Sequence, residues 1–470
     1  MNKYKVLAKN TVLVFLGTFG SSLISFLMLP LYTRWLTTSD YGTVDTISTY
    51  ASILVACVFL NISDSIFIFP KKATELERRG YFSSGIAFIL LAIVVSSLFF
   101  YVIISLLVYF GQHNVLTDYP IMIFIIMCST VIQLYCQAFT RSIDKMLIYS
   151  MTGIVTTFSV ALFSILLIPY WGLKGYVASM VIASLAGALF SVVFSKSYRY
   201  FSLRSVSKGA LKQMLGYSVP LVPNSAMWWI VNGLNRPIME HFLSLASIGI
   251  YAVASKFAGL MQAFMNILST AWTNSALDEY GCKDFENFYN SYLRFLITFL
   301  FIGLYILIPF SKPIIELLTT PEYYTAYRYM PILAFSLVLS GISGNIGAVF
   351  AAAKKSKYFF YSSLYAGSAS LLLLLVFTPM FGLMGVVCSL VGSYMIMLLA
   401  RLYYSRKYVR LNNKSYYVSL FFIFLCIYML EMYVDYYFRY LIYFCLIALI
   451  LMFNRQFIFK FYSLVLKKNK

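Results

Sequence analysis

Long apolar stretches dominate the pattern of hydrophobic and polar positions along the chain. Most of them run for 20–28 residues, and a helix of that length crosses the roughly 30 Å hydrocarbon layer of a bilayer. The two-residue alternation typical of a lipid-facing β-barrel is absent. The pattern therefore predicts an all-α polytopic membrane protein. The fourteen predicted spans are 11–36, 43–70, 81–110, 119–140, 146–169, 175–195, 215–242, 246–277, 289–311, 326–352, 358–379, 384–405, 415–437 and 440–463.

One short motif occurs twice. Residues 169–181 read PYWGLKGYVASMV, and residues 379–391, 210 positions later, read PMFGLMGVVCSLV. Each copy puts a proline and two glycines between two predicted spans. Proline ends a helix and glycine permits a sharp turn, so each copy predicts a short turn on the outer side of the membrane.

Two further pairs of similar segments are separated by nearly the same number of residues. The segment PLYTRWLTTSDYG is followed 207 positions later by PIMEHFLSLASIG, and KMLIYS is followed 212 positions later by KYFFYS. Three matches in the same order indicate an internal duplication of six spans. Because six is even, both copies enter the membrane in the same direction, and a pseudo-two-fold axis along the membrane normal is expected.

The duplication predicts the division of the chain. We expect two six-helix lobes facing a central cleft, the arrangement that alternating access uses, followed by two extra helices. The predicted parts are an amino-terminal lobe at 1–195, a cytoplasmic linker at 196–214, a carboxy-terminal lobe at 215–405, and a final pair of spans with a basic tail at 406–470.

The charges set the orientation. Charged residues make up only 11% of the chain and hydrophobic residues 61%, whereas a soluble protein carries about 25% charged residues. With the amino terminus in the cytoplasm, 28 of the 36 lysines and arginines fall on the cytoplasmic side, as the positive-inside rule requires. The net charge of +20 is thus a topology signal that favours contact with anionic lipids. It does not indicate a nucleic-acid partner.

Ionisable residues inside the predicted spans are few. Each costs roughly 2.5–3.5 kcal/mol at a helix centre, so we expect those present to face a cavity or a partner. The candidate cavity cations are Arg34, Arg236, Lys256 and Arg294. The candidates for polar cavity lining or for coupling are Asp45, Asp64, Asn232, Asn235, Glu240 and Asn266. The candidates for an inner gate are Arg141 and Asp144.

Each group has a plainer interpretation. Arg236 and Glu240 are four residues apart, so they can neutralise each other on one helical face. The neutral polar residues can serve as contacts between helices, and Arg141 with Asp144 can belong to a solvated loop. Since the cations outnumber the acids, the balance favours an anionic cargo, whose phosphate oxygens suit arginine. Asp45 or Asp64 is an alternative carrier of a coupling proton or sodium ion.

Several segments resemble one family. The stretches NTVLVFLGTFGSSLISFLMLPLYTRWLTTSDYGTVDTISTYASIL, NRPIMEHFLSLASIGIYAVASKFAGLM and TTPEYYTAYRYMPILAF are similar to polysaccharide-biosynthesis flippases of the multidrug/oligosaccharidyl-lipid/polysaccharide (MOP) exporter superfamily. The resemblance runs along essentially the whole chain and implies a pair of six-helix lobes. It also favours Arg34 in PLYTRW and Arg236 in LNRP as cavity cations. The family often has aspartate before the second arginine, and here that residue is Asn235.

The resemblance implies a function. The expected activity is translocation of an undecaprenyl-pyrophosphate-linked glycan from the inner to the outer leaflet of the bacterial cytoplasmic membrane, for capsule, O-antigen-like or teichoic polymers. Its partners would be this cargo, membrane lipids and other polysaccharide assembly proteins. No cofactor is implied apart from a coupling ion, H⁺ or Na⁺.

Two other classes remain as alternatives. A multidrug/cation antiporter of the same superfamily would need acids as the dominant cavity charge. A membrane polymerase or ligase would need positioned acids or bases and a sizeable extramembrane loop. The sequence has no G-x-x-x-x-G-K-[ST] and no H-E-x-x-H motif, so we predict neither a catalytic site nor a metal site.

Overall fold

Helices form all the regular structure of the residues that can be described. The computed structural model describes residues 17–353, 355–412 and 414–433, and within these ranges every regular element is helical. Seven of the described helices are long and apolar enough to cross a membrane, and two shorter apolar helices cover Leu245–Gly259 and Ser415–Met429. The predicted all-α class is confirmed. The span at 440–463 and the first residues of the span at 11–36 lie outside the described residues, and the count of fourteen stays a prediction.

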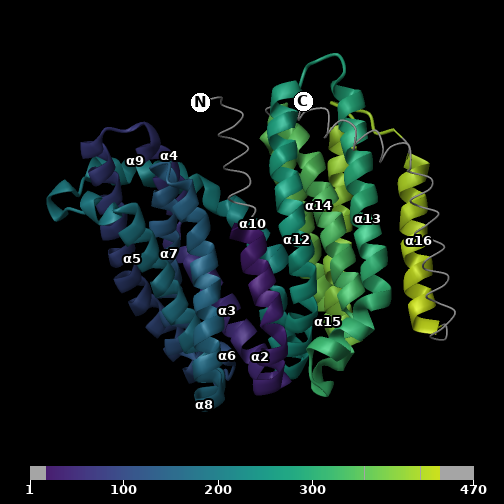
Figure 1. Ribbon diagram of the computed structural model, residues 1–470, viewed down its shortest axis with the longest axis horizontal. Helices are drawn as coiled ribbons and strands as arrows, with labels where there is room; N and C mark the ends of the chain where they lie inside the picture. Colours follow the sequence, from purple (N-terminus) through teal and green to yellow (C-terminus); the bar gives the residue numbers. More distant parts are fainter. Residues whose placement is uncertain (1–16, 354, 413, 434–470) are drawn as a thin grey trace. The chain divides into compact units, whose positions relative to one another are not determined.

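The chain divides into two compact units, 1–256 with 378–383 and 257–377 with 384–470. The predicted lobe boundaries follow the repeat and not this division, so they stay a prediction. In the first unit α5, α7 and α8 run side by side (Figure 1). Its helices are 17–27, α2 (Leu29–Trp35), α3 (Thr38–Phe59), α4 (Ile62–Ile68), η1 (Phe69–Lys72), α5 (Glu75–Tyr109), α6 (Val115–Asp118), α7 (Pro120–Ser142), α8 (Met146–Ser195), η2 (Ser197–Tyr200), η3 (Leu203–Ser205), α9 (Lys208–Ser218), η4 (Val219–Leu221), α10 (Val222–Asn232), α11 (Asn235–Phe242) and the first residues of α12 (Leu245–Glu279).

Local sequence signals set where these helices begin and end. Thr37 and Asp40 form a capping box at the start of α3, which satisfies two amide groups that the helix itself leaves without partners. The helix ends where Leu60 and Asn61 adopt left-handed backbone angles, with φ of 45° and 55°. α7 begins with Pro120 in its first turn, a position where the missing proline N–H costs nothing.

α5 shows which surfaces meet lipid. Its apolar stretch is only 11% buried within the protein, and large side chains such as Leu91, Leu98 and Phe99 are more than 60% exposed. A soluble protein rarely leaves such a continuous apolar surface uncovered. The exposure fits a helix whose outer faces contact acyl chains.

α8 is a hairpin of two spans. A straight helix of its 50 residues would be about 75 Å long, far more than one bilayer crossing. The break falls at Gly172, whose φ of 52° and ψ of −129° are not helical. The hydroxyl pairs Ser164–Ser179 at 2.9 Å and Thr152–Ser191 at 2.8 Å join the two arms, and both pairs are centred between residues 171 and 172. The predicted turn at the first motif is confirmed.

The same hairpin occurs at residues 356–405, of which 378–383 belong to the first unit and the rest to the second. α15 (Ser356–Ser405) also has 50 residues, with its non-helical break at Gly382, where φ is 58°. Arg401, near the end of the predicted span 384–405, is fully buried. The other helices of the second unit are the remainder of α12, α13 (Phe285–Leu318), η5 (Pro321–Arg328), α14 (Met330–Ala352) and α16 (Lys414–Tyr433).

The helix bounds show the repeat over a longer part of the chain than the sequence motifs do. α13 begins 210 residues after α5, α14 begins and ends 210 residues after α7, and α15 does the same after α8. α12 begins 207 residues after α3. The two copies therefore share the positions of these helix starts, and the lengths of α7 and α8 recur in α14 and α15.

Candidate functional site

An ion pair between α3 and α11 forms the centre of the candidate site. Arg236 Nε lies 3.0 Å from Asp45 Oδ2, and the two side chains are 17% and 24% exposed. Both residues belong to the first unit. The pair joins positions 191 residues apart in sequence, a proximity that no local spacing could have predicted.

Neighbouring groups hold the guanidinium in place. Arg236 Nη1 donates to the carbonyl of Asn232 at 3.1 Å and to Asn235 Oδ1 at 3.0 Å. The Tyr251 ring lies 4.8 Å from the guanidinium carbon, and its hydroxyl accepts a hydrogen bond from Asn235 Nδ2 at 2.8 Å. Asn235, which stands where the family often has aspartate, thus binds the arginine as a neutral amide.

Lys256 adds a second cation to this site. It lies on α12, half-buried, close enough to interact electrostatically with both Asp45 and Arg236. Two cations thus face one carboxylate, and the group has a net positive charge. We call Asp45, Arg236 and Lys256 the charge cluster. An anionic group can be attracted to such a cluster because its low-dielectric surroundings screen charge less than water does.

Glu240 lies one helical turn from Arg236 but binds elsewhere. Its carboxylate accepts hydrogen bonds from the Tyr50 hydroxyl at 2.6 Å and from the backbone N–H of Val115 at 2.5 Å. The proposed intrahelical pairing of Arg236 with Glu240 is therefore wrong. Each side chain finds a partner on α3 instead, and Glu240 also satisfies the first N–H group of α6, which has no partner within its own helix.

Two glycines bring the supporting helices together. A Cβ at Gly42 would lie within 2 Å of the Leu245 carbonyl oxygen, and a Cβ at Gly249 would lie 2.0 Å from the carbonyl oxygen of Thr38. The two glycines are the matching positions of the repeated segment, 207 residues apart. The starts of α3 and α12 therefore touch backbone to backbone, which places Asp45 and Lys256 near each other.

The remaining predicted residues lie outside the charge cluster. Arg34 is exposed at the end of α2, and no contact of the described residues joins it to Arg236. Arg294 and Asn266 belong to the second unit, where the Arg294 guanidinium lies 5.2 Å from the Tyr416 ring and Asn266 Oδ1 accepts a hydrogen bond from Gln262.

The inner-gate candidates gather near the α7–α8 connection. The Arg141 guanidinium lies 4.0 Å from the Phe67 ring and interacts electrostatically with the exposed Asp64. Asp144 is exposed in the connection itself, with a φ of 57°. The gate role stays a prediction.

Sequence reasoning missed the residues that position the charge cluster. Tyr50 and Tyr251 bind the charged and amide side chains, yet an aromatic residue in an apolar span gives no signal of its own. It also missed Gln133 and Gln137 on α7. Two amides at a spacing of four in an apolar span mark one polar helical face, and that signal was available.

Comparisons with known proteins agree with this architecture. Residues 7–273, more than half of the chain, match the family of polysaccharide biosynthesis proteins, and residues 220–380 match the MatE family. A protein of the Lsg locus of Haemophilus influenzae is 25% identical over 280 residues, which cover 56% of this chain and 64% of that protein. The match thus spans less than two thirds of that relative.

Solved structures show the same fold. The lipid II flippase MurJ in an inward closed conformation has a TM-score of 0.67 at 15% identity, over 96% of this chain and all of that chain. An inward-facing multidrug resistance MATE family transporter of the MOP superfamily has a TM-score of 0.62 at 13% identity, over 88% of this chain and 94% of that chain. These likenesses establish the MOP fold for this chain.

Proposed function

Because this chain belongs to the family of polysaccharide biosynthesis proteins in the MOP superfamily, a superfamily of multi-pass membrane transporters, we propose that it flips a lipid-linked oligosaccharide. The cargo is a polyprenyl-(pyro)phosphate-linked repeat unit, carried from the inner to the outer leaflet of the bacterial plasma membrane by alternating access. Both chain termini lie in the cytoplasm. The glycan serves surface polysaccharide assembly, such as capsule, O-antigen-like or teichoic polymers.

The charge cluster supports this proposal most directly. It has two cations for one carboxylate, at the meeting of α3, α11 and α12, where an apolar environment would otherwise exclude charge. A guanidinium binds phosphate oxygens through paired, charge-assisted hydrogen bonds. A pyrophosphate group fits this balance, whereas an organic cation would be repelled by it.

The ion pair also suggests how cargo changes the protein. Asp45 and a phosphate group compete for the same Arg236 guanidinium. When the phosphate binds Arg236, the ion pair between Asp45 of α3 and Arg236 of α11 is broken. The hydrogen bond between Tyr50 of α3 and Glu240 of α11 remains. A ligand shifts a conformational equilibrium only through a difference in contacts between the states, and this exchange supplies one.

The proposal is tested in proteoliposomes with a fluorescent polyprenyl-pyrophosphate-linked oligosaccharide, by following its transfer between leaflets. Arg236→Ala and Lys256→Ala should each lower the initial rate by roughly tenfold to a hundredfold, because each removes a charge-assisted contact worth about 1.5–3 kcal/mol. Arg204→Ala is the matched control, since Arg204 is an exposed cation in η3, and it should change the rate less than twofold.

Three outcomes would contradict the proposal. Unchanged transfer in both cluster variants would remove the charge cluster from the cargo path. Failure of the wild-type protein on every lipid-linked glycan would remove the flippase activity. Ion-driven export of organic cations by the same proteoliposomes would favour the antiporter instead.

A further inference from the structure

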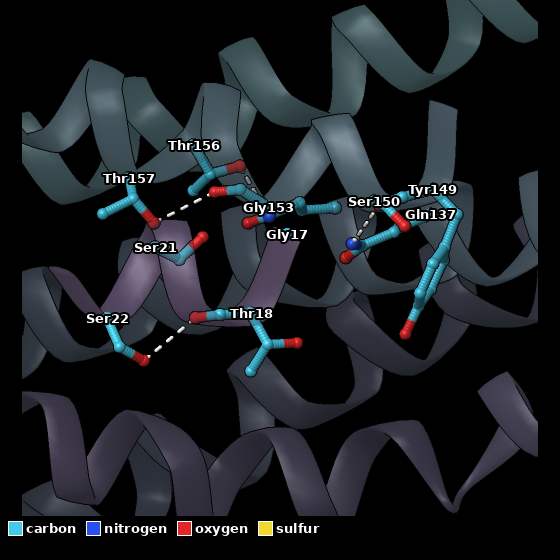
Figure 2. A pocket seen from close by; sticks show the side chains of 11 residues that line it. Gly17, Thr18, Ser21, Ser22, Gln137, Tyr149, Ser150, Gly153, Thr156 and Thr157 are labelled. Atoms are coloured by element: carbon cyan, nitrogen blue, oxygen red, sulfur yellow. Dashed lines mark hydrogen bonds between the residues drawn. The ribbon is translucent and has the colours of Figure 1, made fainter. Parts of the chain in front are cut away.

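A polar pocket of about 370 Å³ lies between helix 17–27, α7 and α8 (Figure 2). Nine of its eleven lining residues bear a hydroxyl or an amide, and the other two are glycines. No lining residue is aliphatic or formally charged. Small-molecule sites of this size are usually lined mainly by apolar side chains, so the chemistry of this lining is itself informative.

Glycines bring the pocket walls together. A Cβ at Gly17 would lie 2.9 Å from the Ser150 carbonyl oxygen, and a Cβ at Gly153 would lie 3.5 Å from Ser21 Oγ. Helix 17–27 therefore packs closely on the first arm of α8. In Figure 2 Ser21 points toward the residues of α8, whereas the Ser22 hydroxyl donates to the Thr18 carbonyl at 3.0 Å.

Two hydroxyl groups in this lining have no partner. The oxygen atoms Ser21 Oγ and Ser150 Oγ are buried and form no hydrogen bond among the described residues, and Ser150 is only 6% exposed. Native proteins rarely leave buried polar atoms unsatisfied, and each such atom calls for an explanation. A ligand that donates and accepts hydrogen bonds would satisfy both.

The two amides hold their positions and still offer acceptors. Gln133 Nε2 donates to Thr156 Oγ1 at 2.9 Å, and Gln137 Nε2 donates to the Tyr149 carbonyl at 3.0 Å. Both bonds use the amide nitrogen, so the carbonyl oxygen of each glutamine remains an acceptor for a ligand. The lining thus offers the two glutamine carbonyl oxygens as acceptors for a ligand, beside the Ser21 and Ser150 hydroxyls as donors.

The second copy of the repeat places a different side chain beside the residues that match part of the pocket lining. At the position 210 residues after Ser191 the chain has Arg401, whose side chain is fully buried. Its guanidinium donates to the Ser343 carbonyl at 2.8 Å and to Ser362 Oγ at 3.1 Å, and it lies 4.3 Å from the Phe359 ring. Ser343 and Phe359 match the pocket residues Gln133 and Tyr149 at the offset of 210, so the second copy has a buried arginine beside residues that line the pocket in the first.

We propose that the pocket binds an uncharged sugar ring of the cargo. The inference rests on the proposed function and names the part of the cargo that this site recognises. A sugar presents several hydroxyls that donate and accept at once, which matches a lining of serines, threonines and glutamines. The pocket has no cation for a phosphate, no acid for an organic cation and no aliphatic surface for an acyl chain.

The sugar pocket is separate from the charge cluster. Ser48, one turn from Asp45, contacts Met180 of α8, and the neighbouring Ser179 pairs with Ser164. The pocket residues Ser150–Thr157 lie seven to fourteen residues before Ser164, on the order of 10–20 Å along the helix. Phosphate and glycan are therefore recognised at different places, the phosphate at the charge cluster of α3, α11 and α12 and the glycan at the pocket beside α8.

The test compares two probes in proteoliposomes, a polyprenyl pyrophosphate that carries a disaccharide and the same lipid without sugar. The double variant Ser21→Ala/Ser150→Ala removes two hydroxyls that bind nothing in the protein, so its thermal stability should stay at the wild-type level. Its half-saturating concentration for the disaccharide probe should rise roughly fivefold to tenfold or more, with that for the sugar-free probe changed less than twofold.

Ser370→Ala is the matched control, because Ser370 Oγ is also buried without a partner but lies in α15, outside the pocket. It should change neither probe. If wild type and the double variant had the same half-saturating concentration for the disaccharide probe, the pocket would be a water-filled polar space between helices. The proposal that it binds sugar would then be wrong. Arg236→Ala should weaken the binding of both probes equally, whereas the double variant should affect only the disaccharide probe. A failure of the flippase activity itself can therefore be distinguished from a failure of sugar recognition.

Discussion

The hairpins α8 and α15 share a length and the position of their break, but they differ in the side chains that join their two arms. In the first copy Thr152 and Ser191 share a hydrogen bond beside a polar pocket. In the second, Ser362 takes the place of Thr152, and Arg401 takes the place of Ser191. The hairpin backbone is thus kept in both copies while the side chains inside it differ, with a buried arginine in one copy and a hydroxyl pair near a polar pocket in the other.

Arg401→Ala should give the largest effect, because it removes a fully buried side chain and leaves a cavity. We expect a loss of about 2–5 kcal/mol, measured as a fall in melting temperature in detergent. Arg401→Met keeps most of the volume and removes a buried charge that has no ion-pair partner among the described residues, so it should stay near wild type.

Ser191→Ala is the counterpart in the first copy and should cost about 1 kcal/mol, the value of one hydrogen bond. If Arg401→Ala were as mild as Ser191→Ala, the arginine would not be a packing element. The contrast between the two hairpins would then fail.

Gly42→Ala and Gly249→Ala should give the next largest effect. In both variants the new methyl group would overlap a backbone carbonyl oxygen, which cannot rotate away as a flexible side chain could. We expect each to destabilise the protein by about 1–3 kcal/mol and to lower transfer of the fluorescent lipid-linked probe. Because the two glycines are equivalent in the repeat, effects that differ by more than about 1 kcal/mol would show that the contact is asymmetric.

The smallest expected effect lies at the starts of α5 and α13. Thr74 and Glu77 form a capping box, with Glu77 Oε2 accepting from the Thr74 backbone N–H at 2.8 Å and from its hydroxyl at 2.9 Å. The matching Asp284 makes no side-chain cap. Thr74→Ala should therefore cost about 1 kcal/mol, and Asp284→Ala close to nothing.

The capping box also predicts a pH dependence. The hydrogen bonds from the Thr74 backbone and hydroxyl lower the pKa of Glu77 below its ordinary value of 4.5. A lowered pKa in the folded state means that the contribution is complete above 4.5 and is lost as the pH falls through the lowered pKa. The protection of amides in the first turn of α5, taken relative to their intrinsic exchange rates at each pH, should thus fall at low pH. An equal fall in protection in the first turn of α13 would contradict this assignment.

Local patterns predicted the fold well because bilayer thickness fixes the length of an apolar run. The breaks at Gly172 and Gly382 could be predicted from the proline and glycines of a repeated motif, and the duplication could be predicted from short matching segments. The partner of Arg236 was not, since Asp45 lies 191 residues away and the nearest acid in sequence is Glu240. The burial of Arg401 was equally hidden, because an arginine at the end of an apolar run reads as a loop charge.

The candidate site was therefore predicted only in part. Charges in apolar spans are rare enough to single out Asp45, Arg236 and Lys256, which the fold brings together. The sugar pocket depends on small neutral residues such as Ser150, which occur throughout these helices. Their role follows from packing against helix 17–27, and no local spacing contains that information.

The start of α5 and both bounds of α7 and of α8 recur in the second copy at a single offset of 210. Loops usually gain and lose residues freely, so this unchanged count across several connections indicates that their lengths are constrained. Each span must start and finish at a membrane face, and an added residue in a tight turn would rotate the following helix by about 100°. The thickness of the bilayer thus constrains these lengths. The offset between the copies changes from 207 at the start of α12 to 210 at the start of α13, so the tolerated insertion lies between these two points.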